Sequence, residues 1–577
     1  MKYSLIQNDG IDLSVHEQIL TNRGIKREDI KHYLSTTEDD ILDPMLLDNM
    51  KEGVALLLKH IKLGSKVFIQ SDSDADGICS ATMLINYLFK QFPNFVNSNL
   101  DVRMHDGKEH GIILDTVINK GYGLVIAPDA SSSEYEIHQA LKETGTDVLV
   151  LDHHEAEKYS EYATVINNQL SENYPNKTLC GGGVVFKFIS MIDSLLKTEY
   201  AKDCLDVVAL SEIADMMDLR TFETRHILTK GLERINNPFL KALVEKQEYS
   251  LGGELTPIGL AFYIAPIINA TIRVGTAEEK KVMFNALLEH RAFEQIPSTK
   301  RGCKGQLETV VSQAIRNGVN IRNRQKKVRD EGIDHVENII EEQKLYDNKI
   351  MIIQVNSTLD KNLTGLIANQ LMAKYQRPVL LVRDTEDGLL QGSGRGSDKS
   401  ELKDLREFLL NSGLVSYAAG HAQAFGVGIP KENISALTDF ANDNLVDFDF
   451  SPCYDVDFIV RANDFDPQDI VYVGGMKPLW GKGVEESFIA IEGVKVRKNN
   501  ITLMSADRNP TIKITLPNET TLIKFGASQE EYESLISEGF VELDVVGTCA
   551  INNWQGRVTP QILVKEYEVQ QKQEYYF

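Results

Sequence analysis

The sequence predicts an α/β protein of several domains, in which a parallel-sheet domain precedes a smaller α/β domain and a C-terminal β-barrel. Three observations predict this fold class. A chain of 577 residues is too long for one hydrophobic core. Between residues 67 and 196, short apolar runs alternate with helical stretches, which indicates parallel strands joined by helices. After about residue 450 the apolar period approaches two, which is typical of antiparallel strands.

The composition favours an ordinary globular protein, with 42% hydrophobic and 25% charged residues. The longest uncharged run, residues 255 to 272, contains Pro257 and Pro266, so a buried segment is expected there rather than a membrane span. The N-terminal residues lack the long apolar core of a signal peptide, and a cytoplasmic location is expected. Six scattered cysteines without a CxxC pair suggest reduced thiols.

Carboxylates follow each predicted strand of the first sheet. Residues 1 to 60 are polar and acidic, and we expect them to form a lead-in that packs on the next domain. The predicted strands are residues 67–69, 124–127 and 148–151, and a helix is predicted over 184–196. Asp72, Asp74 and Asp76 follow the first strand, Asp129 follows the second, and Asp152, His153 and His154 follow the third. Because parallel strands end at one edge, these side chains should converge.

Such a convergence of charge predicts a metal site. Neighbouring carboxylates repel unless cations neutralise them. Two divalent ions about 3.5 to 4 Å apart can generate hydroxide and clamp a phosphate. Oxygen and imidazole ligands suit Mn²⁺ or Mg²⁺ better than a thiolate-lined zinc site does. Gly77 permits the turn that lets Asp74 and Asp76 each address one ion, and Asp129 is the expected bridge.

The middle of the chain is predicted to be helical from 203 to 345, ending in a long polar helix over 306–345. Residues 300 to 330 contain nine Lys or Arg against two acids, a local balance of +7 in a chain of net charge −23. This stretch is either a local nucleic-acid-binding surface or a solvated helix face.

A second α/β pattern begins at residues 349–353, continues through 378–382, and ends around Gly420 and His421. Residues 512–516 and 541–547 are predicted antiparallel strands of the barrel. The predicted domains are 1–60, an N-terminal lead-in; 61–225, the parallel-sheet domain; 226–345, a helical region with a connecting helix; 346–445, the smaller α/β domain; and 450–577, the barrel.

The order of these motifs resembles the DHH phosphoesterase superfamily. The matching segments are residues 72–77, 128–129, 152–154, 179–187 and 213–215. Downstream, residues 392–395 and 419–422 resemble the associated DHHA1 domain. Residues 477–483, 554–557 and 560–561 are similar to the OB-fold of RecJ-type single-strand exonucleases. The resemblance covers residues 60 to about 565.

The resemblance implies roles for individual residues. The implied metal ligands are Asp74, Asp76, Asp129, His153 and Asp215, with Asp72 as a ligand or a second-layer group. His154 and Asp129 are the implied catalytic residues, His154 positioning the scissile phosphate or the water. The implied substrate contacts are Ser393, Arg395 and His421 for the terminal phosphate, Asn269 and Arg273 for the DNA backbone, and Arg103 or Lys108 for a further phosphate. Gln70 stands where the family often has His, and Ile267 and Ile272 replace an Arg and a Gly.

The function implied is a 5′-3′ single-stranded DNA exonuclease that releases mononucleotides with two Mn²⁺ or Mg²⁺ ions, in DNA repair, recombination or a mobile element's replication. The DHHA1 domain would close the cleft and the OB domain would guide the strand, with Trp480 and Trp554 either stacking on bases or filling the barrel core. Besides single-stranded DNA, candidate partners are a single-strand-binding protein, helicase or replication proteins, with no membrane, and a monomer is expected. The alternatives are a DHH phosphodiesterase acting on short oligonucleotides or cyclic dinucleotides, and a non-catalytic DNA-end-binding or replisome scaffold.

Overall fold

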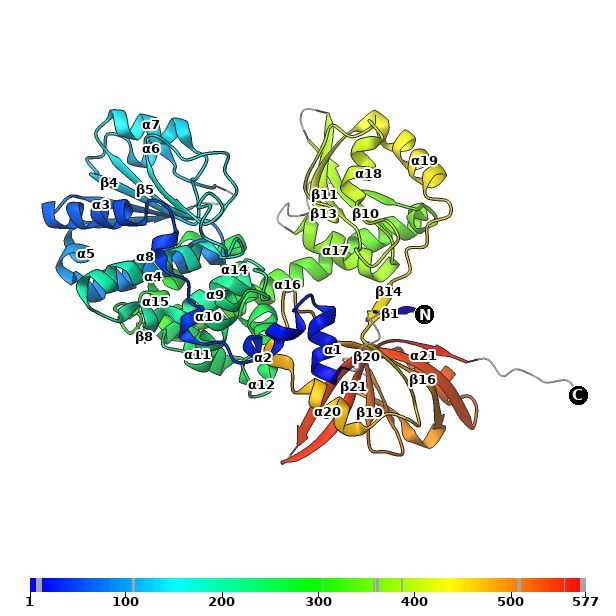
Figure 1. Cartoon of the computed structure of the whole chain (residues 1–577). Helices are drawn as coiled ribbons and strands as arrows, with labels where there is room; N and C mark the ends of the chain where they lie inside the picture. Colours follow the sequence, from blue (N-terminus) through cyan, green and yellow to red (C-terminus); the bar gives the residue numbers. More distant parts are fainter. Residues whose placement is uncertain are drawn as a thin grey trace, which may run out of the picture. The chain divides into compact units, whose positions relative to one another are not determined.

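The computed structural model describes residues 1–6, 13–105, 109–303, 305–355, 359, 363–385, 388–505, 510–554 and 556–570 (Figure 1). The chain divides into two compact units. The first unit comprises Arg23–Asn323 and Met476–Glu486, and the second comprises Met1–Asn22, Arg324–Gly475 and Ser487–Phe577. The five-part domain division therefore stays a prediction, because packing groups the chain differently.

A five-stranded, wholly parallel sheet organises the first unit (Figure 1). Its strands, in spatial order, are β3 (Leu100–Met104), β2 (Val67–Ser71), β4 (Leu124–Pro128), β5 (Asp147–Asp152) and β6 (Thr164–Asn167). The central strands β2 and β4 are buried along their whole length, as expected when helices cover both faces of a parallel sheet. The predicted parallel-sheet domain is confirmed, and the edge strands β3 and β6 are additions to it.

Helices cover both faces of this sheet. On one face, Leu141 of α7 (Tyr135–Glu143) packs with Val125 and Val148. On the other, α3 (Met50–Leu63) brings Gly53 against Leu149. The helices α4 (Ala75–Gln91), α8 (Gly181–Leu196) and α9 (Leu205–Ala214) pack against one another, and α4 is buried over most of its length. This packing brings the starts of α4 and α8 together.

The rest of the first unit is helical, as predicted. Its longer helices are α10 (Phe222–Glu233), α11 (Pro238–Lys246), α14 (Ala265–Val274), α15 (Ala277–Leu287) and the start of α16 (Val310–Gln343). The segment Pro257–Val274 has the length and apolar composition of a membrane span, and 56% of it is buried inside the protein. Ile267 and Ile272 are buried there, which favours a core segment.

The second unit contains the smaller α/β domain. Its sheet has the order β12-β13-β11-β10-β9, and only β9 and β10 are parallel. The strands are β9 (Met351–Val355), β10 (Val379–Asp384), β11 (Leu389–Arg395), β12 (Tyr417–His421) and β13 (Ala424–Pro430), with α17 (Thr364–Tyr375), α18 (Leu405–Asn411) and α19 (Ile434–Asn444). Val336 and Ile340 of α16 pack with Ile367 of α17 in its core, so the long helix runs from one unit into the other.

The C-terminal sheet has seven strands in the order β15-β16-β20-β21-β19-β18-β17. They are β15 (Phe458–Arg461), β16 (Phe488–Arg497), β17 (Ile501–Met504), β18 (Thr511–Thr515), β19 (Thr521–Phe525), β20 (Phe540–Trp554) and β21 (Arg557–Val569). Most neighbours are antiparallel, but β15 runs parallel to β16 and β19 parallel to β21. The predicted antiparallel strands over 512–516 and 541–547 are confirmed as β18 and β20, and the two parallel pairs are additions to them.

The N-terminal lead-in, residues 1–60, is divided between the two units. Its first strand, β1 (Lys2–Leu5), pairs in parallel with β14 (Cys453–Val456), and Gln18 donates to the carbonyl of Asp457 at 2.7 Å. Residues 1–22 thus belong to the second unit, whereas residues from 23 onward lie in the first. The expectation that residues 1–60 pack together on the next domain is wrong for this first part.

Residues 476–486, which we call the inserted segment, pack within the first unit although barrel strands flank them in sequence. Leu219 N–H donates to the carbonyl of Lys482 at 2.9 Å, and Arg225 donates to the carbonyl of Pro478 at 2.7 Å. Trp480 is 1% exposed. Neither expectation for Trp480 holds, since it fills the core of the first unit rather than stacking on bases or filling the barrel. The side chain of Trp554 lies outside the described residues.

Candidate metal centre

The turn between β2 and α4 carries three of the predicted carboxylates. Asp74 caps α4, with its Oδ1 accepting the N–H of Gly77 at 2.9 Å. A Cβ atom on Gly77 would lie 2.6 Å from Cβ of Asp72, so only glycine fits this close approach. The chain therefore reverses tightly enough to present Asp72, Asp74 and Asp76 at one edge of the sheet.

Asp76 is held by the start of α8. Its Oδ2 accepts the N–H of Gly181 at 2.8 Å, and its Oδ1 accepts the N–H of Gly182 at 2.9 Å. The hydroxyl of Ser211 donates to the same Oδ1. A helix N-terminus stabilises a negative charge, so these contacts hold the buried carboxylate in one orientation.

His153 lies at the centre of the carboxylates. Its Nε2 is 3.2 Å from Asp129 Oδ1, 3.4 Å from Asp215 Oδ2 and 3.8 Å from Asp76 Oδ2. These side chains come from the ends of β4, β5 and α9 and from the first turn of α4. Three sets could each hold an ion: Asp76 with His153 and Asp215, Asp72 with Asp74 and Asp129, and Asp129 with His153 and His154. Asp129 belongs to two sets, as a bridging ligand would.

The electrostatics of this cluster fit a divalent cation. Burial, followed by the charges of Asp76 and Asp74, raises the pKa of Asp129 well above its usual range. The same causes raise the pKa of Asp215 to about 7. Burial lowers the pKa of His153, which favours the neutral, ligating ring. Among the described residues, Asp129 Oδ1 and His153 Nε2 are buried without hydrogen-bond partners, a costly state that an ion would relieve.

His154 is fixed beside this cluster by Asp152. Its Nδ1 lies 2.7 Å from Asp152 Oδ1, and Asp152 also accepts the N–H groups of His153 and Ser132. The bond to Asp152 raises the pKa of His154 to about 9. Although burial alone would raise the pKa of Asp152, the bond from His154 keeps it below its usual range. The carboxylate of Asp152 therefore favours the protonated ring of His154, which suits contact with an anion.

Asp72 is surrounded by two histidines that the sequence analysis did not single out. Its Oδ1 lies 3.0 Å from Nδ1 of His105, and its Oδ2 lies 2.8 Å from Nδ1 of His110. Despite burial, the close approach of these two rings lowers the pKa of Asp72 to about 2. Since both oxygens face imidazoles, we infer that Asp72 is a second-layer group. The side-chain amide of Gln70 donates to the carbonyl of Arg103 at 3.2 Å.

The remaining candidates of the first unit lie on β3 and α14. Arg103 forms an ion pair with Glu109 at 2.8 Å, and the alternative candidate Lys108 lies outside the described residues. Asn269 and Arg273 are one turn apart on α14, so they share a face, and Arg273 is exposed. Several cations of the basic stretch are already paired within the chain, Arg316 with Glu308 and Lys327 with Glu331 among them.

The candidates in the second unit meet on one face of its sheet. Ala424 pairs with Arg395 on one side and with His421 on the other, and directly paired residues point to the same face. Ser393 shares this face because it lies two residues from Arg395 along β11. Its hydroxyl is 3.1 Å from that of Thr364 at the start of α17. Serine, arginine and histidine therefore form a polar group suited to an anion.

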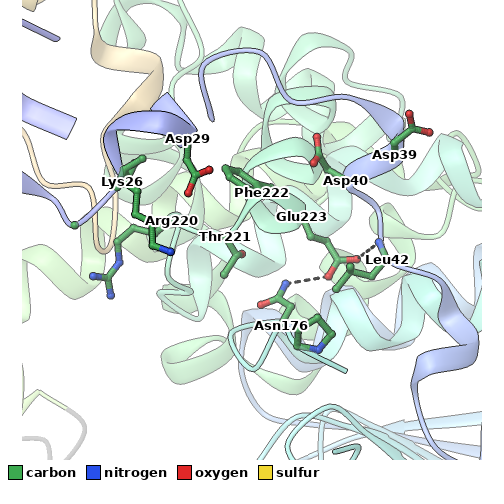
Figure 2. A pocket seen from close by; sticks show the side chains of 13 residues that line it. Lys26, Asp29, Asp39, Asp40, Leu42, Asn176, Arg220, Thr221, Phe222 and Glu223 are labelled. Atoms are coloured by element: carbon green, nitrogen blue, oxygen red, sulfur yellow. Dashed lines mark hydrogen bonds between the residues drawn. The ribbon is translucent and has the colours of Figure 1, made fainter. Parts of the chain in front are cut away.

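A cavity lies elsewhere in the first unit (Figure 2). It has a volume of about 430 Å³, and its lining includes Lys26, Asp40, Arg220 and Glu223. Figure 2 shows Glu223 bonded to Asn176 and to the backbone of Leu42, which indicates a structural role for this carboxylate. None of the predicted metal ligands lines this cavity. The candidate centre is therefore identified by its cluster of carboxylates and imidazoles and not by a cavity.

Fold and centre together define a metal-dependent phosphoesterase with an appended OB domain. Residues 66–211 match the family model for the N-terminal domain of the DHH family. Residues 456–566 match the family model for the RecJ OB domain. One relative is YorK of Bacillus subtilis (strain 168), which is named as a putative SPbeta prophage-derived single-strand DNA-specific exonuclease. Its sequence is 38% identical to this chain over 575 residues, which cover 99% of this chain and 98% of YorK. The single-stranded-DNA-specific exonuclease RecJ of the same organism is 27% identical over 578 residues, covering 96% and 68%.

Solved structures agree on the fold. RecJ of Thermus thermophilus in complex with Mn²⁺ superposes with a TM-score of 0.69 at 18% identity, over 97% of this chain and 79% of that one. Its complex with Mg²⁺ gives a TM-score of 0.63. The chain belongs to the RecJ family of DHH proteins. The expected family and fold class are thereby confirmed.

Proposed function

We propose that this protein is a single-strand-specific DNA exonuclease that hydrolyses phosphodiester bonds with two divalent ions, Mn²⁺ or Mg²⁺. The observation that carries the proposal is the position of His153 Nε2 within 3.2 to 3.8 Å of carboxylates from three different elements. Relatives named for the same activity support it. Asp76, Asp129, His153 and Asp215 would hold the ions, with Asp74 completing the set. Ions in such a site activate the attacking water and clamp the phosphate.

The chain's own groups have separate tasks in this proposal. His154, held as a cation by Asp152, donates to the scissile phosphate. Ser393, Arg395 and His421 in the second unit bind the terminal phosphate, because a guanidinium offers fixed paired donors to an anion. Asn269 and Arg273 hold the DNA backbone, and Arg103 contributes once its pair with Glu109 opens.

Polarity, product and cellular setting are the finer parts of the proposal. We propose 5′-3′ digestion to mononucleotides in the cytoplasm by a monomer that meets single-strand-binding, helicase or replication proteins. The alternative of a phosphodiesterase for very short substrates fits less well, because the RecJ OB domain matches residues 456–566. A non-catalytic scaffold fits less well, because all five implied ligands are present.

The test is digestion of a single-stranded DNA of some tens of nucleotides, labelled at either end, with Mn²⁺ or with EDTA. The proposal predicts metal-dependent release of labelled mononucleotide from the 5′ end and no digestion of blunt duplex. Turnover of dinucleotides alone would favour the small-substrate phosphodiesterase. Inertness toward both substrates would favour the scaffold.

A further inference from the structure

Two imidazoles in the first unit are presented in the same manner, and the implied site residues include only one of them. His154 Nδ1 lies 2.7 Å from a carboxylate oxygen of Asp152, and His110 Nδ1 lies 2.8 Å from a carboxylate oxygen of Asp72. The two rings are 5.6 Å apart between centroids and meet edge to face at 77°. His110 is thus a structural counterpart of His154.

Burial shows which atoms of these pairs are available. The carboxylates of Asp72 and Asp152 are 5% and 1% exposed, whereas the side chains of His110 and His154 are 55% and 46% exposed. A carboxylate only accepts hydrogen bonds, so Nδ1 of each ring carries the hydrogen that faces it. The free atom of each ring is therefore Nε2, on the exposed side.

The described part of the loop that carries His110 is well anchored. His105, buried at the end of β3, donates from Nε2 to the carbonyl of Gly111 at 2.7 Å. The N–H of Ile112 donates to Glu134 at 3.0 Å, and Glu109 is engaged by Arg103. These bonds flank His110 on both sides, so its ring is held in position by Asp72 and by its backbone.

We propose that His110 is a further substrate-contacting residue, which donates from Nε2 to a non-bridging oxygen of the scissile phosphodiester, opposite the contact made by His154. The proposal rests on the proposed function, since it requires a phosphodiester at this centre. A phosphate oxygen is an acceptor, and Nε2 is the ring nitrogen that the contact with Asp72 leaves on the exposed side of a ring whose centroid lies 5.6 Å from that of His154. Two imidazoles at this spacing would hold the phosphate from two sides.

The competing explanation is that His110 only restrains Asp72. Three variants separate the two roles. His110→Asn keeps an amide N–H near the position of Nδ1, so it can still bond to Asp72, but it has nothing at the position of Nε2. His110→Gln places an amide near the position of Nε2 but loses the bond to Asp72. His110→Ala loses both the bond to Asp72 and the donor at Nε2. Substrate contact predicts that the Asn and Ala variants lose kcat/KM equally, on the order of 10²-fold, whereas the Gln variant recovers part of it.

A matched control is available in the same unit. His32 Nε2 lies 2.6 Å from Asp40 with a side-chain exposure of 45%, and it is not part of the metal centre. His32→Ala should leave kcat/KM within about twofold of the unchanged protein. Melting temperature and Mn²⁺ affinity are measured for all variants. Mn²⁺ affinity should be unchanged for the His110 series, and the melting temperature should fall only for the Gln and Ala variants, which lose the bond to the buried carboxylate of Asp72.

The outcomes are distinct. Full activity in His110→Asn with loss in His110→Ala would overturn the proposal in favour of the restraint, and loss of Mn²⁺ affinity would assign His110 to the ion site instead. The proposal would also be overturned if kcat/KM of all three His110 variants stayed within threefold of the value for the unchanged protein. If the unchanged protein digests no DNA, the proposed function has failed instead.

A measurement on the unchanged protein covers the case in which a variant does not fold. Diethyl pyrocarbonate modifies accessible imidazoles, and peptide mass spectrometry locates the modified rings. With Ca²⁺ in place of Mn²⁺, a short oligothymidylate should protect His110 and His154 together but not His32. Protection of His154 without His110 would contradict the proposal.

Discussion

The N–H of Gly181 donates to Asp76 Oδ2 at 2.8 Å, although 105 residues separate the two in sequence. This bond joins the start of α8 to the first turn of α4. A Cβ atom on Gly181 would also lie 2.4 Å from Asp129 Oδ1, so the helix start packs directly against a second implied ligand. The geometry of the centre therefore depends on how closely α8 approaches the strand ends.

Gly181→Ala tests this dependence. The added methyl group must displace Asp129 or the helix, so we expect nuclease activity to fall by about tenfold or more and the free energy of unfolding to fall by about 1 to 3 kcal/mol. Urea unfolding and end-labelled digestion measure the two effects. Gly539→Ala is the control, because nothing lies within 4 Å of the added Cβ there. Unchanged activity in Gly181→Ala would show that the centre tolerates a wider spacing.

The pKa of Asp215 predicts how pH affects the ion-free protein. Its folded pKa of about 7 lies above the unfolded value of roughly 3.9. The folded state therefore binds the extra proton between these values, so stability falls as pH rises from about 4 to 7. We expect the melting temperature in EDTA to fall over this window and Asp215→Asn to flatten the slope. Mn²⁺ should raise the melting temperature more at pH 7.5 than at pH 5.5, because the ion competes with the proton.

The pair of Asp152 and His154 predicts an alkaline limit of activity. Since Asp152 raises the pKa of His154 to about 9, the ring loses its charge only above that pH. Activity should decline above pH 9, and Asp152→Asn should move the decline toward neutral pH because the ring loses its carboxylate. His154→Gln should lower kcat on the order of 10²-fold and remove this limb. The pH–rate profiles of the three proteins check this, and identical alkaline limbs would exclude His154 as their cause.

The inserted segment predicts a purely structural effect for Trp480. With 1% of its surface exposed, this side chain stabilises the first unit, so Trp480→Ala should cost about 3 to 5 kcal/mol of unfolding free energy. Tyr249→Ala, at a residue 99% exposed, should change the unfolding free energy by less than about 0.5 kcal/mol. Both are measured by urea unfolding. An unfolding free energy that is unchanged in Trp480→Ala would contradict this structural role.

The sequence predicted the central strands but not the edges of the first sheet. Strands β2, β4 and β5 are nearly continuous apolar runs because both faces are covered, whereas β3 contains Asp101 and Arg103 and is partly exposed. Missing β3 meant missing His105, which follows its end. Had β3 been recognised, the rule that strand ends meet at one edge would have drawn attention to His105 and His110.

Contacts between distant segments were beyond the reach of local patterns. Nothing in residues 476–486 indicates that they pack beside Leu219 rather than in the barrel that flanks them. The pairing of β1 with β14 joins residues some 450 apart, and strand pairing at that distance leaves no local signal. The implied ligands were found because their order along the chain resembles a known family, and their mutual distances required the structure.

The most direct test of the metal centre is the number of Mn²⁺ ions bound, measured by isothermal titration and by electron paramagnetic resonance on the full chain. We predict two ions per chain in the unchanged protein and loss of at least one in Asp129→Asn, because the buried Asp129 Oδ1 has no hydrogen-bond partner among the described residues and lies 3.2 Å from His153 Nε2 at the centre of the cluster. Asp439→Asn, an exposed acid on α19, should still bind two. No bound Mn²⁺ in the unchanged protein, or two ions retained at unchanged affinity in Asp129→Asn, would contradict the account.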